Sequence, residues 1–179
     1  MASRKSITRY LDELLRIDSF EDYGPNGMQV EGKHDVQRIV CGVSASRVLF
    51  EHAVAENADM VIVHHGLIWR HNDPVIKGWY RDRLKILLEH DMTLLSYHLP
   101  LDAHETIGNN HPAAAALGLE DTTEFARIGV RGRFPQPLPT KDLLVRLADF
   151  YQHDPLVLGA EREAVSSLAL VSGGAAREL

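Results

Sequence analysis

Histidine residues cluster in the middle of this 179-residue sequence, in a pattern that could bind metal ions. Seven of the ten histidines lie between His64 and His111. His64 and His65 follow the apolar stretch 60–63 directly, and a second polar group runs from His98 through Asp102 to His104. Imidazole and carboxylate groups together are ligands that zinc, manganese and iron take in proteins. The sequence therefore predicts a divalent metal site. Five histidines are interpreted as surface residues: His34, His52, His71, His90 and His153.

Two adjacent histidines are expected to serve two ions better than one. Successive side chains of a strand point to opposite faces, so His64 and His65 would chelate a single ion poorly. An aspartate could bridge two neighbouring ions, which together supply the Lewis acidity used in hydrolysis. The alternative is that His64 and His65 are hydrogen-bonded core residues. For His98, His104 and His111 three roles stay open: orienting a ligand, facing a substrate, or capping a loop.

Alternating strand and helix patterns place both polar groups at the ends of strands. Apolar runs predict strands over 38–43, 59–63, 92–97, 130–134 and 168–171. Helices are predicted over 7–14 with Ser3 or Ser6 as cap, from Ser44 or Ser46 to 57, over 76–90, from Pro112 to Gly118, and from a Thr140 cap onwards. This order is typical of a parallel sheet with right-handed crossovers. Because ligands bind beyond the carboxyl ends of parallel strands, the two polar groups are expected to converge.

The predicted architecture is an α/β layered fold with a parallel-containing sheet flanked by helices. We expect a single domain over 1–179, with a small sub-lobe over 120–165. The segment 23–32 contains three glycines and a proline, so it is either a shaped loop or a simple connector. Asn109 and Asn110 are expected to form a turn and a helix cap, and the segment 172–174 is a weak candidate for a phosphate cradle.

Composition narrows the class of protein. The formal net charge of −6 disfavours nucleic acid as a partner. No stretch reaches the roughly 18 apolar residues that a membrane helix requires. A lone cysteine, Cys41, excludes internal disulfides and a zinc site with several cysteines. A cytoplasmic protein is expected.

Several motifs together resemble the YbgI family, also called NIF-three-like or GTP cyclohydrolase I type 2-like. They are Asn-Gly-Met-Gln-Val-Glu-Gly over 26–32, Val-Ile-Val-His-His-Gly over 61–66, Tyr-His-Leu-Pro-Leu-Asp-Ala-His over 97–104, Gly-Asn-Asn over 108–110 and Ser-Gly-Gly over 172–174. The resemblance implies a centre of two divalent metal ions. It matches His64, His65 and Asp102 to metal ligands, and His98 to a polar position in the same cavity.

The resemblance also implies a function and an assembly. The function is a dinuclear-metal-dependent hydrolase, GTP cyclohydrolase-like, that acts on a small nucleotide-like substrate, with His98 or His104 assisting proton transfer. The alternative is a non-catalytic metal-binding assembly or adaptor protein. The family usually forms a toroidal hexamer, so a homo-oligomer is expected. Its interface could include Ile68, Trp69, Trp79 and Tyr80, unless both tryptophans pack internally.

The family's sequence usually continues beyond its Ser-Gly-Gly segment. That C-terminal part contains a histidine and a glutamate that complete the metal site, and neither can be mapped onto these 179 residues. For the chain as it stands, we therefore expect weak or partial metal binding, low hydrolytic activity and an uncovered sheet edge.

Overall fold

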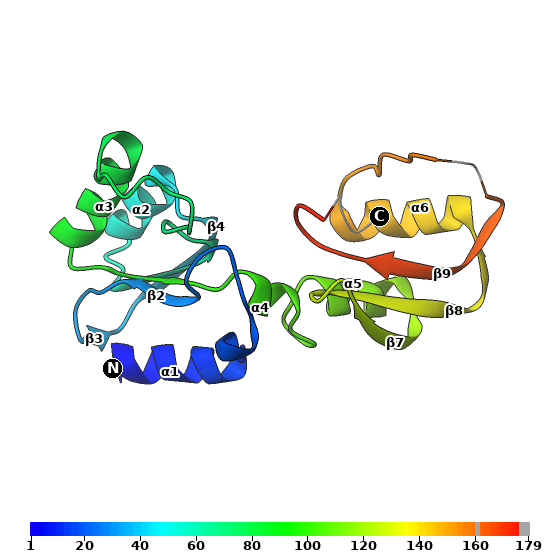
Figure 1. The fold of residues 1–179 in the computed structure, drawn as a ribbon, viewed down its shortest axis with the longest axis horizontal. Coiled ribbons are helices and arrows are strands. Elements are labelled where there is room, and N and C mark those ends of the chain that lie inside the picture. The colour runs from blue at the N-terminus through cyan, green and yellow to red at the C-terminus, as the bar shows by residue number, and fades with distance from the viewer. Residues whose placement is uncertain (160–161, 176–179) are drawn as a thin grey trace. The chain divides into compact units, whose positions relative to one another are not determined.

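The computed structural model describes residues 1–159 and 162–175 (Figure 1). The chain divides into two compact units, Met1–Leu101 and Asp102–Leu179. The predicted metal ligands are split between the two units, because His64 and His65 belong to the first and Asp102 begins the second. Each unit is described by itself.

Unit 1 is built on a four-stranded sheet with the strand order β2-β6-β5-β4. The strands are β2 (Gly27–Val30), β4 (Ile39–Ser44), β5 (Met60–His65) and β6 (Thr93–Ser96). Strands β4, β5 and β6 run parallel to one another, and β2 joins the edge of β6 in the antiparallel direction. A two-stranded ribbon pairs β1 (Ala2–Ser3) with β3 (Asp35–Val36). The predicted α/β fold with a parallel-containing sheet is confirmed.

Helices cover both faces of this sheet. They are α1 (Arg4–Leu14), α2 (Arg47–Ala55) and α3 (Gly78–Glu89). The short helix α4 (Leu99–Asp102) follows β6, and its last residue belongs to unit 2. Figure 1 shows α2 and α3 on one face of the sheet and α1 on the other. Two predicted caps are confirmed, because the hydroxyl of Ser3 accepts a hydrogen bond from the Ser6 N–H and that of Ser46 accepts one from the Leu49 N–H.

Side chains that alternate along β5 divide unit 1 into two apolar cores. Val61 and Val63 face α2 and α3, where Phe50 and Leu87 are fully buried. Met60 faces the opposite side and packs with Leu15, Tyr97 and the apolar stripe of α1. A strand buried on both faces is apolar throughout, which explains the continuous apolar run before His64.

The segment 23–32 is more than a loop. Its residues Gly27–Val30 form the edge strand β2, paired with β6. The interpretation of this segment as a simple connector was therefore wrong. The sequence pattern did not predict this strand, because it has only four residues and turn-forming residues flank it on both sides.

Unit 2 contains a three-stranded antiparallel sheet in the order β7-β8-β9. The strands are β7 (Glu120–Phe125), β8 (Gly129–Pro139) and β9 (Ala164–Leu170), and the helices are α5 (Asn110–Leu117) and α6 (Thr140–Tyr151). Val130, Phe134 and Leu143 lie in its core. The range of the expected sub-lobe, 120–165, falls inside this unit. Residues 160–161 of that range lie outside the described residues.

Two details of unit 2 differ from the prediction. The proline-rich segment 135–139 continues β8 beyond the end that the sequence predicts for this strand, residue 134. The pairing register between β8 and β9 shifts between Arg133 and Leu138, so Pro135 and Pro137 lie where the ladder is interrupted, whereas Pro139 pairs with Ala164. Thr140 does not cap α6 with its side chain, because its hydroxyl donates to the Arg162 carbonyl.

None of the helices in the described part of the chain is both long and apolar enough to span a membrane.

Candidate metal centre

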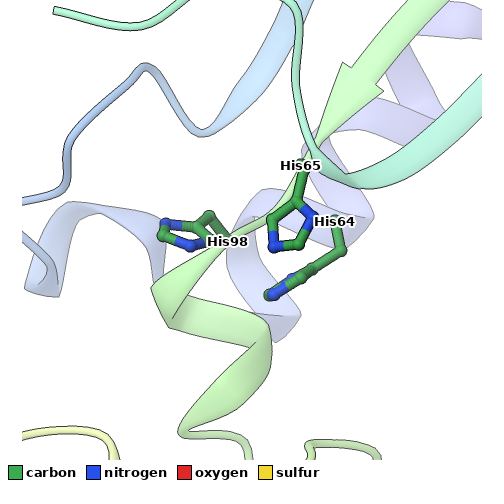
Figure 2. A group of neighbouring side chains, drawn as sticks. All are labelled: His64, His65 and His98. Carbon is green, nitrogen blue, oxygen red and sulfur yellow. The ribbon is translucent and has the colours of Figure 1, made fainter. Parts of the chain in front are cut away.

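Three histidines of unit 1 come together at the carboxyl ends of β5 and β6. His64 and His65 end β5, and His98 lies between β6 and α4 (Figure 2). Their ring centroids are 4.5 Å (His64–His65), 5.0 Å (His64–His98) and 5.7 Å (His65–His98) apart. One nitrogen from each ring lies within 4.8 Å of the other two. The group could therefore hold a metal ion.

The rings of His64 and His65 lie closer together than strand alternation predicts. Alternation determines the direction in which each Cβ leaves the backbone. Gly66 follows immediately and β5 ends at His65, so both rings can turn toward the same edge of the sheet. The expectation that adjacent histidines diverge does not hold at this strand end.

Hydrogen bonds at Nδ1 determine the tautomers of His64 and His98. Nδ1 of His64 lies 3.0 Å from the carbonyl oxygen of Tyr97, and Nδ1 of His98 lies 2.8 Å from Oδ1 of Asp22. A carbonyl or an ionised carboxylate only accepts, so each Nδ1 must carry the hydrogen. In the neutral ring, Nε2 then carries the lone pair that a metal ion needs.

His65 follows the same arrangement with a different partner. Its Nδ1 lies 3.0 Å from the hydroxyl oxygen of Ser44, which is also its neighbour in the β4–β5 ladder. A hydroxyl can accept or donate, so this bond allows the Nδ1–H tautomer. All three rings thus use Nδ1 for a protein hydrogen bond, which is the usual arrangement of metal-binding histidines.

The carboxylate beside His98 is buried and fully hydrogen-bonded. Asp22 is 5% exposed. Burial acts to raise its pKa, but hydrogen bonds from His98, Asn26 and the backbone N–H groups of Leu99 and Tyr23 outweigh burial and lower the pKa to about 2. The side chain is therefore ionised at neutral pH, and it accepts the His98 Nδ1–H.

The segment 23–32 fixes the backbone on both sides of the histidines. Oδ1 of Asn26 accepts the His98 N–H at 2.8 Å. The side-chain oxygen of Gln29 accepts the N–H groups of Leu67 and Ile68 at 2.7 and 2.9 Å. A side chain at Gly66 would overlap the Gln29 amide. Two motifs that are separate in the sequence therefore meet here, and each shapes the other.

An aromatic side chain borders the group. The Trp69 ring lies 5.2 Å from that of His98, edge to face at 88°, and 6.5 Å from that of His65. Its Nε1–H donates to the Gly66 carbonyl at 3.0 Å, which anchors the indole. Trp69 is half-buried.

Asp102, the predicted carboxylate ligand, belongs to unit 2 and is 2% exposed. Its Oδ1 accepts hydrogen bonds from the Asn109 amide at 2.6 Å and from the Ser172 hydroxyl at 2.8 Å. Asn109 occupies the N-cap position of α5 but makes no side-chain cap bond there. Ser172, considered as part of a phosphate cradle, also holds this carboxylate. The side chains of Asn109 and Ser172 thus orient the carboxylate of Asp102. The assignment of Asp102 as a metal ligand stays a prediction.

His104 also lies in unit 2. Its Nδ1 accepts the N–H groups of Thr106 and Ile107 at 3.2 and 3.3 Å, so the ring caps a loop. Capping was one of the alternatives considered for this residue, and a part in proton transfer stays a prediction.

The amino-acid sequence matches a known protein family over nearly its whole length. The sequence profile of Duf34/NIF3 (NGG1p interacting factor 3) matches residues 2–179. The chain belongs to the Duf34/NIF3 family. The resemblance to the NIF-three-like proteins is confirmed.

Individual members of the family are similar in sequence and in structure. A protein of Yersinia pestis named GTP cyclohydrolase 1 type 2 homolog is 43% identical over 165 residues, which are 92% of this chain and 67% of that protein. The solved structure of the protein ybgI is 40% identical, with a TM-score of 0.89 over 97% of this chain and 70% of that one. A solved structure from Thermus thermophilus is 41% identical, with a TM-score of 0.86 over 97% of this chain and 72% of that one.

Several residues of the candidate site could not be found by sequence reasoning. Asp22 lies 76 residues from its partner His98, and Ser44 lies 21 residues from His65. Gln29 lies in one of the sequence motifs, but the motif alone does not predict its hydrogen bonds to the N–H groups of Leu67 and Ile68. The composition of the segment 23–32 could have indicated that it has a structural role, because three glycines and a proline lie within ten residues.

Proposed function

We propose that this protein is a dinuclear-metal-dependent hydrolase that acts on a small nucleotide-like molecule, in the manner of a GTP cyclohydrolase. The observation that carries the proposal is the group of three histidine rings, each of which uses Nδ1 for a protein hydrogen bond. The name GTP cyclohydrolase 1 type 2 homolog, given to relatives 43% and 42% identical, supports the class of reaction.

The donor set fits a borderline divalent metal. His64, His65 and His98 would supply nitrogen ligands, and Asp102 would supply a carboxylate. Nitrogen with carboxylate oxygen suits zinc, manganese or iron. When bound, such ions supply Lewis acidity for the hydrolytic step.

The residues of the chain do the positioning. Tyr97, Asp22 and Ser44 hold the three rings in place, and Asn109 with Ser172 holds Asp102. Trp69 offers an aromatic surface beside His98 that suits a planar heterocyclic ring. In the proposal, His104 assists proton transfer.

The test is metal-dependent turnover. Purified protein is stripped with a chelator, reloaded with zinc or manganese and incubated with GTP and a panel of other nucleotides. We expect slow loss of the substrate in the metal-loaded protein and no loss in the stripped protein, with the substrate measured by chromatography. His65→Ala should abolish turnover, whereas His52→Ala, which replaces an exposed histidine on α2, should leave it unchanged.

Absence of turnover with every substrate at full metal occupancy would contradict the hydrolase. That outcome would favour a metal-binding assembly or adaptor protein, the second function considered.

A further inference from the structure

Asp22 is a buried carboxylate that reaches the candidate metal centre through one of its histidines. It lies between the short 3₁₀ helix Ile17–Ser19 and β2, in a part of the chain that the sequence motifs do not include. Its Oδ1 accepts the His98 Nδ1–H at 2.8 Å and the Tyr23 N–H at 2.6 Å. Its Oδ2 accepts the Asn26 amide at 2.9 Å and the Leu99 N–H at 3.0 Å.

We propose that Asp22 is a positioning residue of the metal centre, and that it holds His98 in the tautomer and orientation that present Nε2 to His64 and His65. This role rests on the proposed metal-dependent function. Asp22 contacts the ring of His98, so it acts on the centre through that histidine.

The first argument is chemical. An ionised carboxylate cannot donate, so it accepts the hydrogen of Nδ1 and leaves the lone pair on Nε2. The carboxylate also strengthens the ring as a ligand, because negative charge beside Nδ1–H raises the basicity of Nε2. The Nδ1 partner of His64 is a neutral backbone carbonyl, whereas that of His98 is a carboxylate with a full negative charge.

The second argument is geometric. Asp22 binds the N–H of Leu99, the residue after His98, and the amide of Asn26, whose Oδ1 accepts the N–H of His98 itself. The ring and the backbone on both sides of it are therefore tied to one carboxylate. The His98 side chain is 19% exposed, so the packing around it leaves it little freedom to take another position.

A matched control exists in the same unit. Asp59 is also buried, at 6% exposed, and accepts two backbone N–H groups, from Gln37 and Arg38. Its ion pair is with Lys33 and not with a histidine. Asp59→Asn therefore removes a buried carboxylate of the same kind without touching His98.

The experiment measures zinc affinity by competition with a chromogenic chelator. Asp22→Asn should weaken zinc binding about 10- to 100-fold, the usual loss when a ligand's hydrogen-bond partner is removed. Asp59→Asn should stay close to the wild-type affinity. In a His98→Ala background, Asp22→Asn should cause no further loss, because its effect passes through His98. A purely structural role would lower affinity in both backgrounds.

A second readout needs no metal. Nitrogen-15 NMR of the metal-free protein at constant neutral pH should show the His98 hydrogen on Nδ1 in the wild type and moved toward Nε2 in Asp22→Leu, whose side chain offers no acceptor. Wild-type zinc affinity in Asp22→Asn together with the wild-type tautomer in Asp22→Leu would overturn this role while leaving the proposed metal centre intact. A wild-type protein that binds no zinc would instead overturn the proposed function.

If Asp22→Asn fails to fold, Asp22→Glu replaces it in both measurements. The longer side chain keeps the charge but displaces it, so zinc affinity should still fall. Unchanged affinity and an unchanged tautomer in Asp22→Glu would overturn the role.

Discussion

At the scale of single residues, the candidate centre depends on which ring nitrogen carries a hydrogen. Tyr97 and Asp22 each accept from Nδ1 of a histidine, and Ser44 is placed to do the same. Tyr97 acts through its backbone carbonyl, which every residue type has, and Ser44 acts through a common hydroxyl group. The sequence alone therefore marks the histidines but not the groups that orient them.

Single alanine substitutions should separate metal binding from folding. His64→Ala, His65→Ala and Asp102→Ala should each lower the metal content of the purified protein, measured by elemental analysis. Thermal unfolding of the two histidine variants should change little, because the apolar residues of β5 behind the histidines remain. Undiminished metal in all three variants would refute the assignment of ligands.

Protonation of Asp59 in acid should lower the free energy of unfolding of the protein. Burial acts to raise its pKa, but Lys33 and the N–H groups of Gln37 and Arg38 outweigh it and lower the pKa to about 2. A carboxylate whose pKa is lowered by folding stabilises the native state fully above its unfolded pKa of about 3.9, and this contribution is lost as the pH falls toward 2.

The expected loss from this one group is on the order of 1–2 kcal/mol, reduced by solvent screening because Lys33 is half-exposed. Denaturant titrations at pH 7 and at about pH 2.5, followed by circular dichroism, measure it. Asp59→Asn should be less stable than the wild type at pH 7 and should lose less stability on acidification. Equal losses in the two proteins would contradict the role of Asp59.

At the scale of elements, β2 and the turn after β5 shape each other. The Gln29 amide of β2 donates to the Ile68 carbonyl at 3.3 Å and accepts two N–H groups of the same turn. Gly66 leaves the space that this amide occupies. The turn decides where β5 ends, and so where the rings of His64 and His65 lie.

Gly66→Ala should therefore disturb both the fold and the site. Its methyl group would overlap the hydrogen-bonded Gln29 amide, and overpacking of this kind costs about 1–3 kcal/mol of unfolding free energy. We also expect weaker zinc binding. The control is Gly174→Ala, at a position where an added side chain meets open space, which should leave both quantities unchanged. A Gly66→Ala protein as stable as the wild type would contradict the argument.

Sequence patterns predicted those elements that have long apolar runs or clear caps. The parallel strands β4, β5 and β6 follow from their apolar runs, and α1 and α2 follow from their serine caps. The strands β2 and β7 were missed. β2 is short and lies among turn residues, while β7 is exposed and mostly polar, with the sequence Glu-Asp-Thr-Thr-Glu-Phe. An exposed polar strand has no hydrophobic period to detect.

The candidate site was predictable to a similar extent. Two polar groups at the ends of neighbouring strands were expected to converge, and the structure brings His64, His65 and His98 together. The pairing of His98 with Asp22 was not predictable, because tertiary packing alone joins residues 76 positions apart.

At the scale of the whole molecule, the chain combines two units with separate cores. Of the four residues considered for a subunit interface, Trp69 borders the histidines and Tyr80 packs on the core of unit 1. Trp79 is 56% exposed, so the alternative that both tryptophans are internal was wrong. Unit 2 exposes a further apolar segment, with Leu156 and Leu158 each 85% exposed.

Exposed apolar segments of this kind favour association. We expect light scattering at micromolar concentration to give a multiple of the 20.0 kDa chain mass, a hexamer by the family resemblance. Replacing Leu156 and Leu158 with serine should shift the mass toward that of one chain. Leu88→Ser, at an exposed position of α3, is the control. A wild-type mass of one chain would contradict the homo-oligomer.

The central claim is that divalent metal binds through Nε2 of His64, His65 and His98. The most direct test is anomalous diffraction at the zinc edge from crystals of the zinc-loaded full chain. The account predicts one or two peaks among the three rings, each ring bonded through Nε2 at about 2.0–2.1 Å. Zinc bound only elsewhere, or through Nδ1 with the hydrogen bonds to Tyr97 and Asp22 broken, would contradict it.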